Sequence, residues 1–258
     1  MLNWDPSLYL QFDAERTQPA VDLVNRIHIG APRRIADLGC GPGNSTAILA
    51  ARWHGAKITG IDNSREMLEQ ARRQYPAIEW EFADIGQWSP AERFDLLFSN
   101  AALQWVTGQQ LLLPRLVSFL NSGGMFAAQI PYHLHSLVHR VIEATAQQGP
   151  WAARLRGAHD VFEIRKPAEY YDILAPHSRR VQVWVTEYIH VFDSPTPIVS
   201  WMQGTGLRPY LARLTEDEQT DFLRAFGEAV SQAYRPQVDG RILFGFPRMF
   251  LLAEAHAG

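Results

Sequence analysis

Cysteine and lysine are scarce in this chain of 258 residues, and each scarcity excludes something. Cys40 is the single cysteine, so no disulfide framework can form within the chain. Lysine occurs only as Lys57 and Lys166, which leaves arginine to carry nearly all the positive charge. Arginine suits carboxylate recognition, but codon composition can produce the same excess of arginine over lysine. The 24 basic and 27 acidic residues give a net charge of −3, which argues against a dedicated nucleic-acid-binding protein.

Long apolar runs are also missing. No stretch of about 18 apolar residues occurs, so we expect no transmembrane helix. Residues Met1–Pro6 lack a basic region followed by an apolar one, so we expect no signal peptide. The composition, 47% hydrophobic and 20% charged, is typical of globular proteins. We therefore expect a cytoplasmic protein, a monomer or weak dimer, that has neither a membrane nor a nucleic-acid partner.

Short apolar runs alternate with helical patterns along the first half of the chain. The runs predict strands at residues 34–39, 56–62, 78–82, 94–99 and 125–130. Helices are predicted at 44–53, from the cap Ser64 to about 75, and at 109–120, the last ending at Asn121–Gly124. This alternation implies a parallel sheet with helices on both faces. Further strands at 181–192 and 242–253 complete an α/β fold with a doubly wound, mostly parallel, seven-stranded sheet.

Two segments are too long to be plain connections between strands. Residues 133–175 and 195–234 are predicted to be mostly helical, and Thr215–Glu218 has the pattern of a capping box at a helix start. Long insertions above a sheet usually build substrate pockets or lids. We therefore expect residues 1–258 to form a single domain that carries two helical cap insertions.

The strongest motif is the glycine loop Asp37-Leu38-Gly39-Cys40-Gly41-Pro42-Gly43, which joins a predicted strand to a predicted helix. Glycines in this position let a ligand approach the backbone closely. Asp62 ends the second predicted strand and Asp84 follows the third, so both acids should lie at the carboxyl edge of the sheet, where such folds bind ligands. Asn44 stands where an NAD fingerprint has its third glycine, and no lysine follows as in a phosphate-binding P-loop.

This glycine loop resembles the first motif of the class I S-adenosylmethionine-dependent methyltransferases, which have a Rossmann-like fold. The resemblance implies S-adenosyl-L-methionine as cofactor, S-adenosylhomocysteine as product, and a cofactor-binding core at about residues 30–131. It places Asp62 on the ribose, Asp84 on the adenine amino group, and Asp37 near the methionine ammonium, directly or through water. The residues that it implies for cofactor binding are Asp37, Gly39, Gly41, Gly43, Asp62, Asn63, Asp84, Ile85 and Asn100.

Other segments resemble a narrower family, the trans-aconitate methyltransferases. They are Asn3–Leu10, Ser99–Trp105, Gly204–Pro209 and Leu243–Phe250, and the resemblance covers nearly the whole chain except Gln147–Lys166. It implies methyl transfer to a carboxylate oxygen of trans-aconitate or a related small polycarboxylate, giving a monomethyl ester. A carboxylate is already ionised at neutral pH and needs no general base. We therefore expect no catalytic residue and no metal ion, only alignment of the methyl donor and acceptor.

A polycarboxylate acceptor needs cationic and hydroxyl donors. Arg208 is the favoured cation, because it lies in a glycine-rich loop where Pro209 should hold it in an extended conformation. Tyr188 and His190 alternate with Ile189 and should share one face of a strand. The residues predicted to bind the acceptor are Tyr9, Arg16, Gln104, Trp105, Tyr132, His133, Tyr188, His190, Arg208 and Arg248.

Three other functions stay open at this point. A malonyl-carrier-protein carboxyl methyltransferase has a similar motif after the fourth strand, and arginine pairs such as Arg72-Arg73 offer local basic patches for an acidic carrier. Methylation of a phenol or carbon centre would need a base, for which His133 or His190 could serve. A non-catalytic cofactor-binding module is disfavoured by the complete glycine loop, its two downstream acids and Asn100.

Overall fold

The computed structural model describes residues 13–133 and 136–256, with side chains from residue 17 onward. The chain divides into two compact units. The core unit comprises residues 17–131, 162–186 and 248–256, and the helical unit comprises, within the described chain, residues 13–16, 132–133, 136–161 and 187–247. The single domain expected from the sequence stays a prediction.

Seven strands form one sheet in the order β3-β2-β1-β4-β5-β7-β6. Their bounds are β1 Arg34–Leu38, β2 Lys57–Asp62, β3 Glu79–Phe82, β4 Phe94–Asn100, β5 Leu120–Pro131, β6 Arg180–Phe192 and β7 Ile242–Glu254. The pairs β1–β2, β1–β4, β2–β3 and β4–β5 are parallel, while β5–β7 is antiparallel. The predicted fold class, a mostly parallel seven-stranded sheet of Rossmann-like type, is therefore confirmed.

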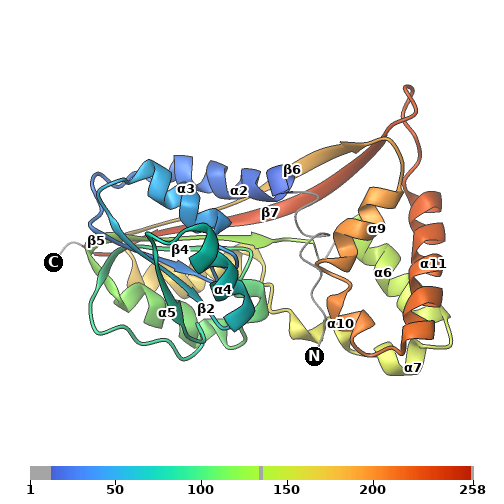
Figure 1. The fold of residues 1–258 in the computed structure, drawn as a ribbon, viewed down its shortest axis with the longest axis horizontal. Coiled ribbons are helices and arrows are strands. Elements are labelled where there is room, and N and C mark those ends of the chain that lie inside the picture. Colours follow the sequence, from blue (N-terminus) through green and yellow to red (C-terminus); the bar gives the residue numbers. More distant parts are fainter. Residues whose placement is uncertain (1–12, 134–135, 257–258) are drawn as a thin grey trace. The chain divides into compact units, whose positions relative to one another are not determined.

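Helices cover both faces of the sheet in the core unit. Helices α2 and α3 lie on one face and α5 on the other (Figure 1). Ser64 caps α4 as predicted, because its hydroxyl oxygen accepts the backbone N–H of Met67 at 3.3 Å. Besides α2 (Asp13–Arg26), whose first four residues are assigned to the helical unit, the helices of this unit are α3 (Asn44–Arg52), α4 (Arg65–Gln74), η1 (Leu103–Trp105), α5 (Gln109–Ser118), α8 (Pro167–Leu174) and η3 (Ala175–His177).

The start of β5 differs from the sequence prediction. The segment Asn121–Gly124 was expected to be a turn before a strand at residue 125, whereas β5 already begins at Leu120. The pairing with β4 shifts register between Phe94 and Leu96, so residues 121–124 of β5 form an irregularity within the strand. Gly123 provides the positive φ of 70° that the irregularity uses.

The helical unit has its own hydrophobic core. Its helices are α6 (Leu137–Gln148), α7 (Ala152–Leu155), η2 (Ala158–Val161), α9 (Thr196–Gln203), α10 (Arg208–Leu211) and α11 (Glu216–Ala233). Fully buried Trp201, Phe222, Phe226 and Phe244 pack in the centre of this core. The predicted capping box at the start of α11 is confirmed, with Thr215 accepting the backbone N–H of Glu218.

The insertion expected at 133–175 is divided between the two units. Residues up to 161 belong to the helical unit, but α8 belongs to the core unit, where it contacts α5. The buried Tyr170 explains this assignment, since its hydroxyl donates a hydrogen bond of 2.7 Å to Oε1 of Gln109 at the start of α5. None of the described helices has the length and apolarity needed to cross a membrane.

Candidate active site

The glycine loop makes the tight turn that the sequence predicted. The backbone N–H groups of Gly39 and Cys40 both donate to the carbonyl oxygen of Ile61, which fixes the loop against the end of β2. Gly39 has a φ of 75°, and a Cβ atom added there would lie 2.2 Å from Cβ of Ala102. Only glycine fits that position. Gly41 also has a positive φ of 54°, but an added Cβ would meet no atom within 4 Å. The loop therefore presents open space above Gly41.

Asp37 lies at the end of β1 and is completely buried. Its Oδ2 accepts hydrogen bonds of 2.7 Å from the hydroxyls of Ser45 and Thr46 on α3. Its Oδ1 is buried and has no hydrogen-bond partner. Burial raises the pKa of Asp37 to about 6, and the hydrogen bonds from the two hydroxyls only partly offset this rise. A buried carboxylate oxygen without a donor is the kind of group that a bound cation would satisfy.

Asp62 closes the glycine loop from the end of β2. Its Oδ2 accepts the backbone N–H of Gly41 at 2.9 Å, and its Oδ1 accepts the backbone N–H of Ser64 at 2.8 Å. Burial raises the pKa of this carboxyl group, and the backbone donors oppose the rise. Each carboxylate oxygen still has acceptor capacity for a ligand hydroxyl. The neighbouring Asn63 is exposed at the same edge of the sheet.

The turn after β3 holds Asp84 and Ile85. Oδ1 of Asp84 accepts the backbone N–H of Gly86 at 2.8 Å, and the side chain is exposed, whereas Ile85 is buried. Arg115 on α5 fixes this turn by donating to the carbonyl oxygens of Ile85 and Gly86, at 3.1 and 2.7 Å. Sequence reasoning missed Arg115. A lone charge in the apolar helix segment Leu111–Val117 was the signal that could have found it.

The end of β4 adopts a strained conformation. Ala101 has a φ of 55°, the one positive φ among the non-glycine residues whose backbone the structure describes. Its N–H donates to the carbonyl oxygen of Gln129 at 2.9 Å, and its carbonyl oxygen accepts Nε2 of Gln104 at 2.6 Å. Oδ1 of Asn100 is buried without a hydrogen-bond partner. Strained backbone and unsatisfied amides together are typical of functional sites.

The segment after β4 is supported by residues that sequence reasoning also missed. The buried Gln109 donates from Nε2 to the carbonyl oxygens of Leu103 and Glu163, both within 2.8 Å. The Glu163 carboxylate accepts the backbone N–H of Gly108 at 2.6 Å, at the start of α5. Trp105 is 40% exposed, and its ring centroid lies 4.5 Å from that of Phe162. Trp105 is therefore accessible, in contrast to the fully buried Leu103.

The predicted acceptor residues of the helical unit have varied surroundings. His133 is buried, and its ring stacks on Phe246 at 6.1 Å. His190 lies 4.8 Å from the Trp201 ring, within the aromatic core of the unit. Tyr188 is half-buried, and the alternation with Ile189 is confirmed, since Ile189 is 52% exposed. Tyr132 is half-buried, and its N–H pairs with the carbonyl oxygen of Pro247.

The conformation predicted for Arg208 is wrong. Instead of standing in an extended loop, Arg208 begins the short helix α10. Pro209 is tolerated there because the first turn of a helix leaves its backbone N–H groups unpaired. Gly204 and Gly206 do not have positive φ values, so neither forms a left-handed turn. Arg208 is half-buried, and burial lowers the pKa of its guanidinium.

Arg248 belongs to the core unit, on the antiparallel strand β7 opposite Pro131 of β5. Its side chain is buried, with an exposed fraction of 5%. Tyr9 lies outside the described residues, as does the side chain of Arg16. Within the described chain, no three histidine, cysteine, aspartate or glutamate side chains gather as a metal site requires.

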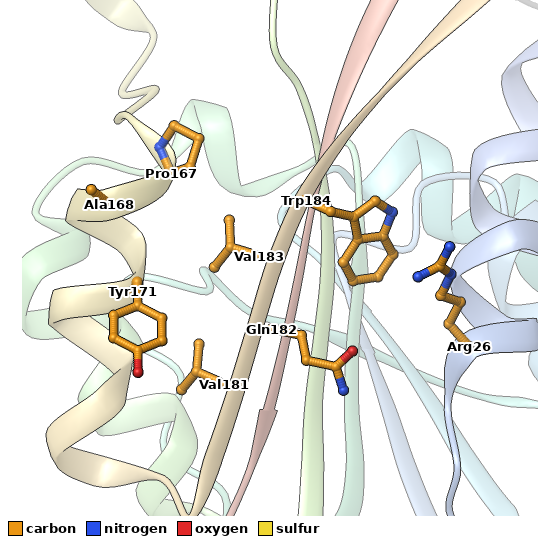
Figure 2. A pocket seen from close by; sticks show the side chains of 8 residues that line it. All are labelled: Arg26, Pro167, Ala168, Tyr171, Val181, Gln182, Val183 and Trp184. Carbon is orange, nitrogen blue, oxygen red and sulfur yellow. The ribbon is translucent and has the colours of Figure 1, made fainter.

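A pocket of about 520 Å³ lies elsewhere in the core unit, around the outermost strand β6. Figure 2 shows Val181 and Val183 on the side of α8, and Trp184 on the side of Arg26. The guanidinium of Arg26 lies 4.8 Å over the Trp184 ring. None of the residues that line this pocket belongs to the glycine loop or to the strand ends described above. The pocket is therefore separate from the candidate active site.

Comparison with known proteins assigns the family. The model of a methyltransferase domain matches residues 35–124. The trans-aconitate 2-methyltransferase of Azoarcus sp. is 46% identical to this chain, over 98% of the chain and 99% of that protein. The chain belongs to the trans-aconitate 2-methyltransferase family.

Solved structures agree with the fold of this trans-aconitate 2-methyltransferase family member. The YcgJ protein from Bacillus subtilis matches 93% of the chain and 100% of its own, with a TM-score of 0.60 and 12% identity. A phosphoethanolamine N-methyltransferase from Haemonchus contortus, solved with S-adenosylhomocysteine, matches 93% of the chain and 53% of its own, with a TM-score of 0.57 and 12% identity.

The core unit brings most of the predicted cofactor residues together at one edge of its sheet. They lie at or just after the carboxyl ends of β1, β2, β3 and β4, whose parallel arrangement places these ends side by side. Gln104, Trp105 and Arg248 are the predicted acceptor residues in the same unit. Tyr132, His133, Tyr188, His190 and Arg208 belong to the helical unit of this family member.

Proposed function

We propose that this protein transfers the methyl group of S-adenosylmethionine to a carboxylate oxygen of trans-aconitate, giving a monomethyl ester and S-adenosylhomocysteine. The observation that carries the proposal is the 46% identity to a trans-aconitate 2-methyltransferase over nearly the full length of both chains. A match restricted to the glycine loop would support only the cofactor. A match that also includes the later segments supports the acceptor as well.

The residues at the carboxyl edge fit S-adenosylmethionine, which supplies an electrophilic methyl group on a sulfonium. The unpartnered Oδ1 of Asp37 suits the methionine ammonium, as a buried acceptor that lacks a donor. The open space above Gly41 accommodates the part of the ligand that passes over the loop. Asp62 would hold the ribose and Asp84 the adenine amino group, with Gly39, Gly43, Asn63, Ile85 and Asn100 completing the proposed set.

The chain needs no proton-transferring residue for this reaction. An acceptor carboxylate has an ordinary pKa of about 4, so it is ionised and nucleophilic at neutral pH. The work left to the protein is to hold the carboxylate in line with the methyl group and to exclude water. Gln104, Trp105 and Arg248 are the core-unit residues that we propose for the acceptor. The helical-unit residues stay sequence predictions.

We further propose that the protein acts on its small-molecule substrate in the cytoplasm, as a monomer or weak dimer, without a nucleic-acid or membrane partner. The net charge of −3 supports the lack of a nucleic-acid partner, and the single cysteine is consistent with a reducing compartment. Sedimentation of the purified protein over a range of concentrations would test the oligomeric state, and a stable tetramer would contradict it.

The acceptor is tested by initial rates with purified protein, methyl-labelled cofactor and a panel of acceptors. The panel contains trans-aconitate, cis-aconitate, citrate, tricarballylate and malonyl carrier protein. We expect trans-aconitate to have the highest kcat/KM and malonyl carrier protein to give no label transfer. Faster transfer to the carrier protein would refute the proposal in favour of the other carboxyl methyltransferase class.

A further inference from the structure

Gln129 is a buried amide near the end of β5 that no sequence argument singled out. Its exposed fraction is 0%, and both Oε1 and Nε2 are buried without a hydrogen-bond partner. Gln129 is tied to the active-site edge by its backbone, because its carbonyl oxygen accepts the N–H of the strained Ala101. Burying an amide whose N–H and carbonyl groups both lack hydrogen-bond partners costs free energy, unless a bound group supplies those partners.

Another buried glutamine of the same unit, Gln109, shows the hydrogen bonds that a structural role requires. Gln109 is equally buried, yet its Nε2 donates to the carbonyl oxygens of Leu103 and Glu163, and its Oε1 accepts the hydroxyl of Tyr170. Gln109 holds three segments of the chain together. Gln129 makes none of the corresponding side-chain bonds, so its amide is not explained by folding.

The register of the sheet gives Gln129 informative neighbours. It is paired with Asn100 on β4, and residues paired across neighbouring strands place their side chains on the same face. Asn100 also has a buried, unpartnered Oδ1. On the other side, β5 pairs with β7, where Arg248 is opposite Pro131 and therefore shares the face of Gln129, two residues along. Two amides and a guanidinium thus follow one face of three adjacent strands.

The same register separates Gln129 from the proposed ammonium site. Asp37 is paired with Phe98 on β4, and Phe98 is paired with Ala127 on β5. Asp37 is therefore two strands away from Gln129 and two residues back along the strand direction, which together correspond to about 12 Å at the usual strand and residue spacings. That distance is too long for one ligand group to contact both side chains. Gln129 therefore lies away from the proposed ammonium site and on the face it shares with Arg248, which we propose for the acceptor.

We propose that Gln129 binds a carboxylate of the acceptor, other than the one that is methylated. Its Nε2 donates a hydrogen bond to that carboxylate, and Arg248 supplies the neutralising charge from the next strand. This assignment rests on the proposed function, because it requires an acceptor with more than one carboxylate. It makes Gln129 a residue that selects polycarboxylates over monocarboxylates of similar size.

Two substitutions test the proposal, and a third is the matched control. Gln129→Met keeps the length of the side chain and removes its hydrogen bonds, while Gln129→Glu adds a negative charge that opposes a carboxylate. Gln182→Met makes the same change at a glutamine of the core unit that lines the separate pocket. Each variant is measured for turnover of trans-aconitate, for calorimetric binding of trans-aconitate to the protein–S-adenosylhomocysteine complex, for binding of S-adenosylhomocysteine alone, and for Tm.

We expect Gln129→Met to raise the KM and the Kd for trans-aconitate at least tenfold, and Gln129→Glu to raise them further. S-adenosylhomocysteine binding should change less than twofold. The Tm of Gln129→Met should not fall, because the substitution removes an unsatisfied buried amide. Gln182→Met should match the wild type throughout.

The outcomes separate this proposal from the proposed function. Wild-type turnover of trans-aconitate together with unchanged acceptor binding in Gln129→Met would overturn the role of Gln129 alone. An equal loss of S-adenosylhomocysteine affinity would make Gln129 a cofactor contact, and a lowered Tm with intact acceptor binding would make it structural. Both results overturn the assignment. A wild-type complex that neither binds nor methylates trans-aconitate would overturn both proposals.

Discussion

The ionisation of Asp37 should make cofactor-product binding depend on pH. The Asp37 carboxyl is completely buried, and its pKa is raised to about 6 from its ordinary value of 3.8, with burial as the largest cause. At pH 5 about nine in ten molecules of the free protein carry a protonated Asp37, against about one in ten at pH 7. In the proposed site, the ammonium of the ligand binds to the ionised carboxylate of Asp37. We therefore expect S-adenosylhomocysteine to bind about tenfold more tightly at pH 7 than at pH 5.

As pH rises, the unfolding free energy of the ligand-free protein should fall because of Asp37, whereas ligand affinity should increase. The folded-state pKa is higher than the unfolded one, so the contribution of Asp37 to stability is fully present below pH 3.8 and is lost as pH rises through about 6. The difference between the two pKa values corresponds to about 3 kcal/mol of unfolding free energy. Ligand binding should recover part of this loss at pH 7.

Isothermal titration calorimetry from pH 5 to 7, in two buffers of different ionisation enthalpy, measures both the affinity and the protons released. Asp37→Asn should flatten the pH dependence, while Asp193→Asn, at a side chain that is 97% exposed, should leave it unchanged. An affinity that is constant between pH 5 and 7 would refute the reasoning, as would an Asp37→Asn variant with the wild-type dependence.

Four further substitutions have expected outcomes, in the same binding assay or in unfolding measurements. Asp62→Ala should weaken S-adenosylhomocysteine binding by about 1.5–3 kcal/mol, because charge-assisted hydrogen bonds are lost, and unchanged affinity would remove Asp62 from the ribose. Gly39→Ala should lower the unfolding free energy by about 3 kcal/mol or more through its clash with Ala102. Gly41→Ala should cost only about 1–2 kcal/mol of stability yet abolish ligand binding, and normal binding would show that the space above Gly41 is not used. Arg115→Met should reduce affinity by about 1 kcal/mol, because the turn after β3 loses its donors, whereas full affinity in a folded variant would contradict that role.

The sheet could be predicted because the information that specifies it is local. β1, β2 and β4 are short, mostly apolar runs, whereas β3, at the edge of the sheet, alternates glutamate with aromatic residues. Ser64 and Thr215 were found as caps because a capping side chain bonds to a backbone N–H three residues away. The three acids at the ends of β1, β2 and β3 followed from the strands themselves.

Elements whose stability depends on distant packing were predicted less well. Helix α2 was not predicted, because it contains Pro19 and its apolar pattern is short. Leu23 and Val24 are nevertheless completely or almost completely buried in the folded core unit, and this burial outweighs the weak local helix preference of the segment. The extended form predicted for Arg208 was wrong for a related reason, since the local preference of a residue before proline was overcome by the helix α10.

The candidate site shows the same division between local and distant information. The glycine loop and its acids form a sequence motif, so they could be read directly. Arg115 and Gln129 have no motif, because their importance comes from partners that only the fold brings near. Arg115 donates to carbonyl groups about 30 residues away in the chain. Gln129 stands out through the lack of partners for a buried amide, which no sequence pattern reveals.

The central claim is that the methyl group is transferred to a carboxylate oxygen. It is tested most directly by the alkali lability of the product formed from trans-aconitate and methyl-labelled S-adenosylmethionine. A methyl ester is hydrolysed by mild alkali, whereas an ether or a carbon-bound methyl group is not. The account predicts that the label is released quantitatively as methanol. Label that survives alkaline hydrolysis would contradict it.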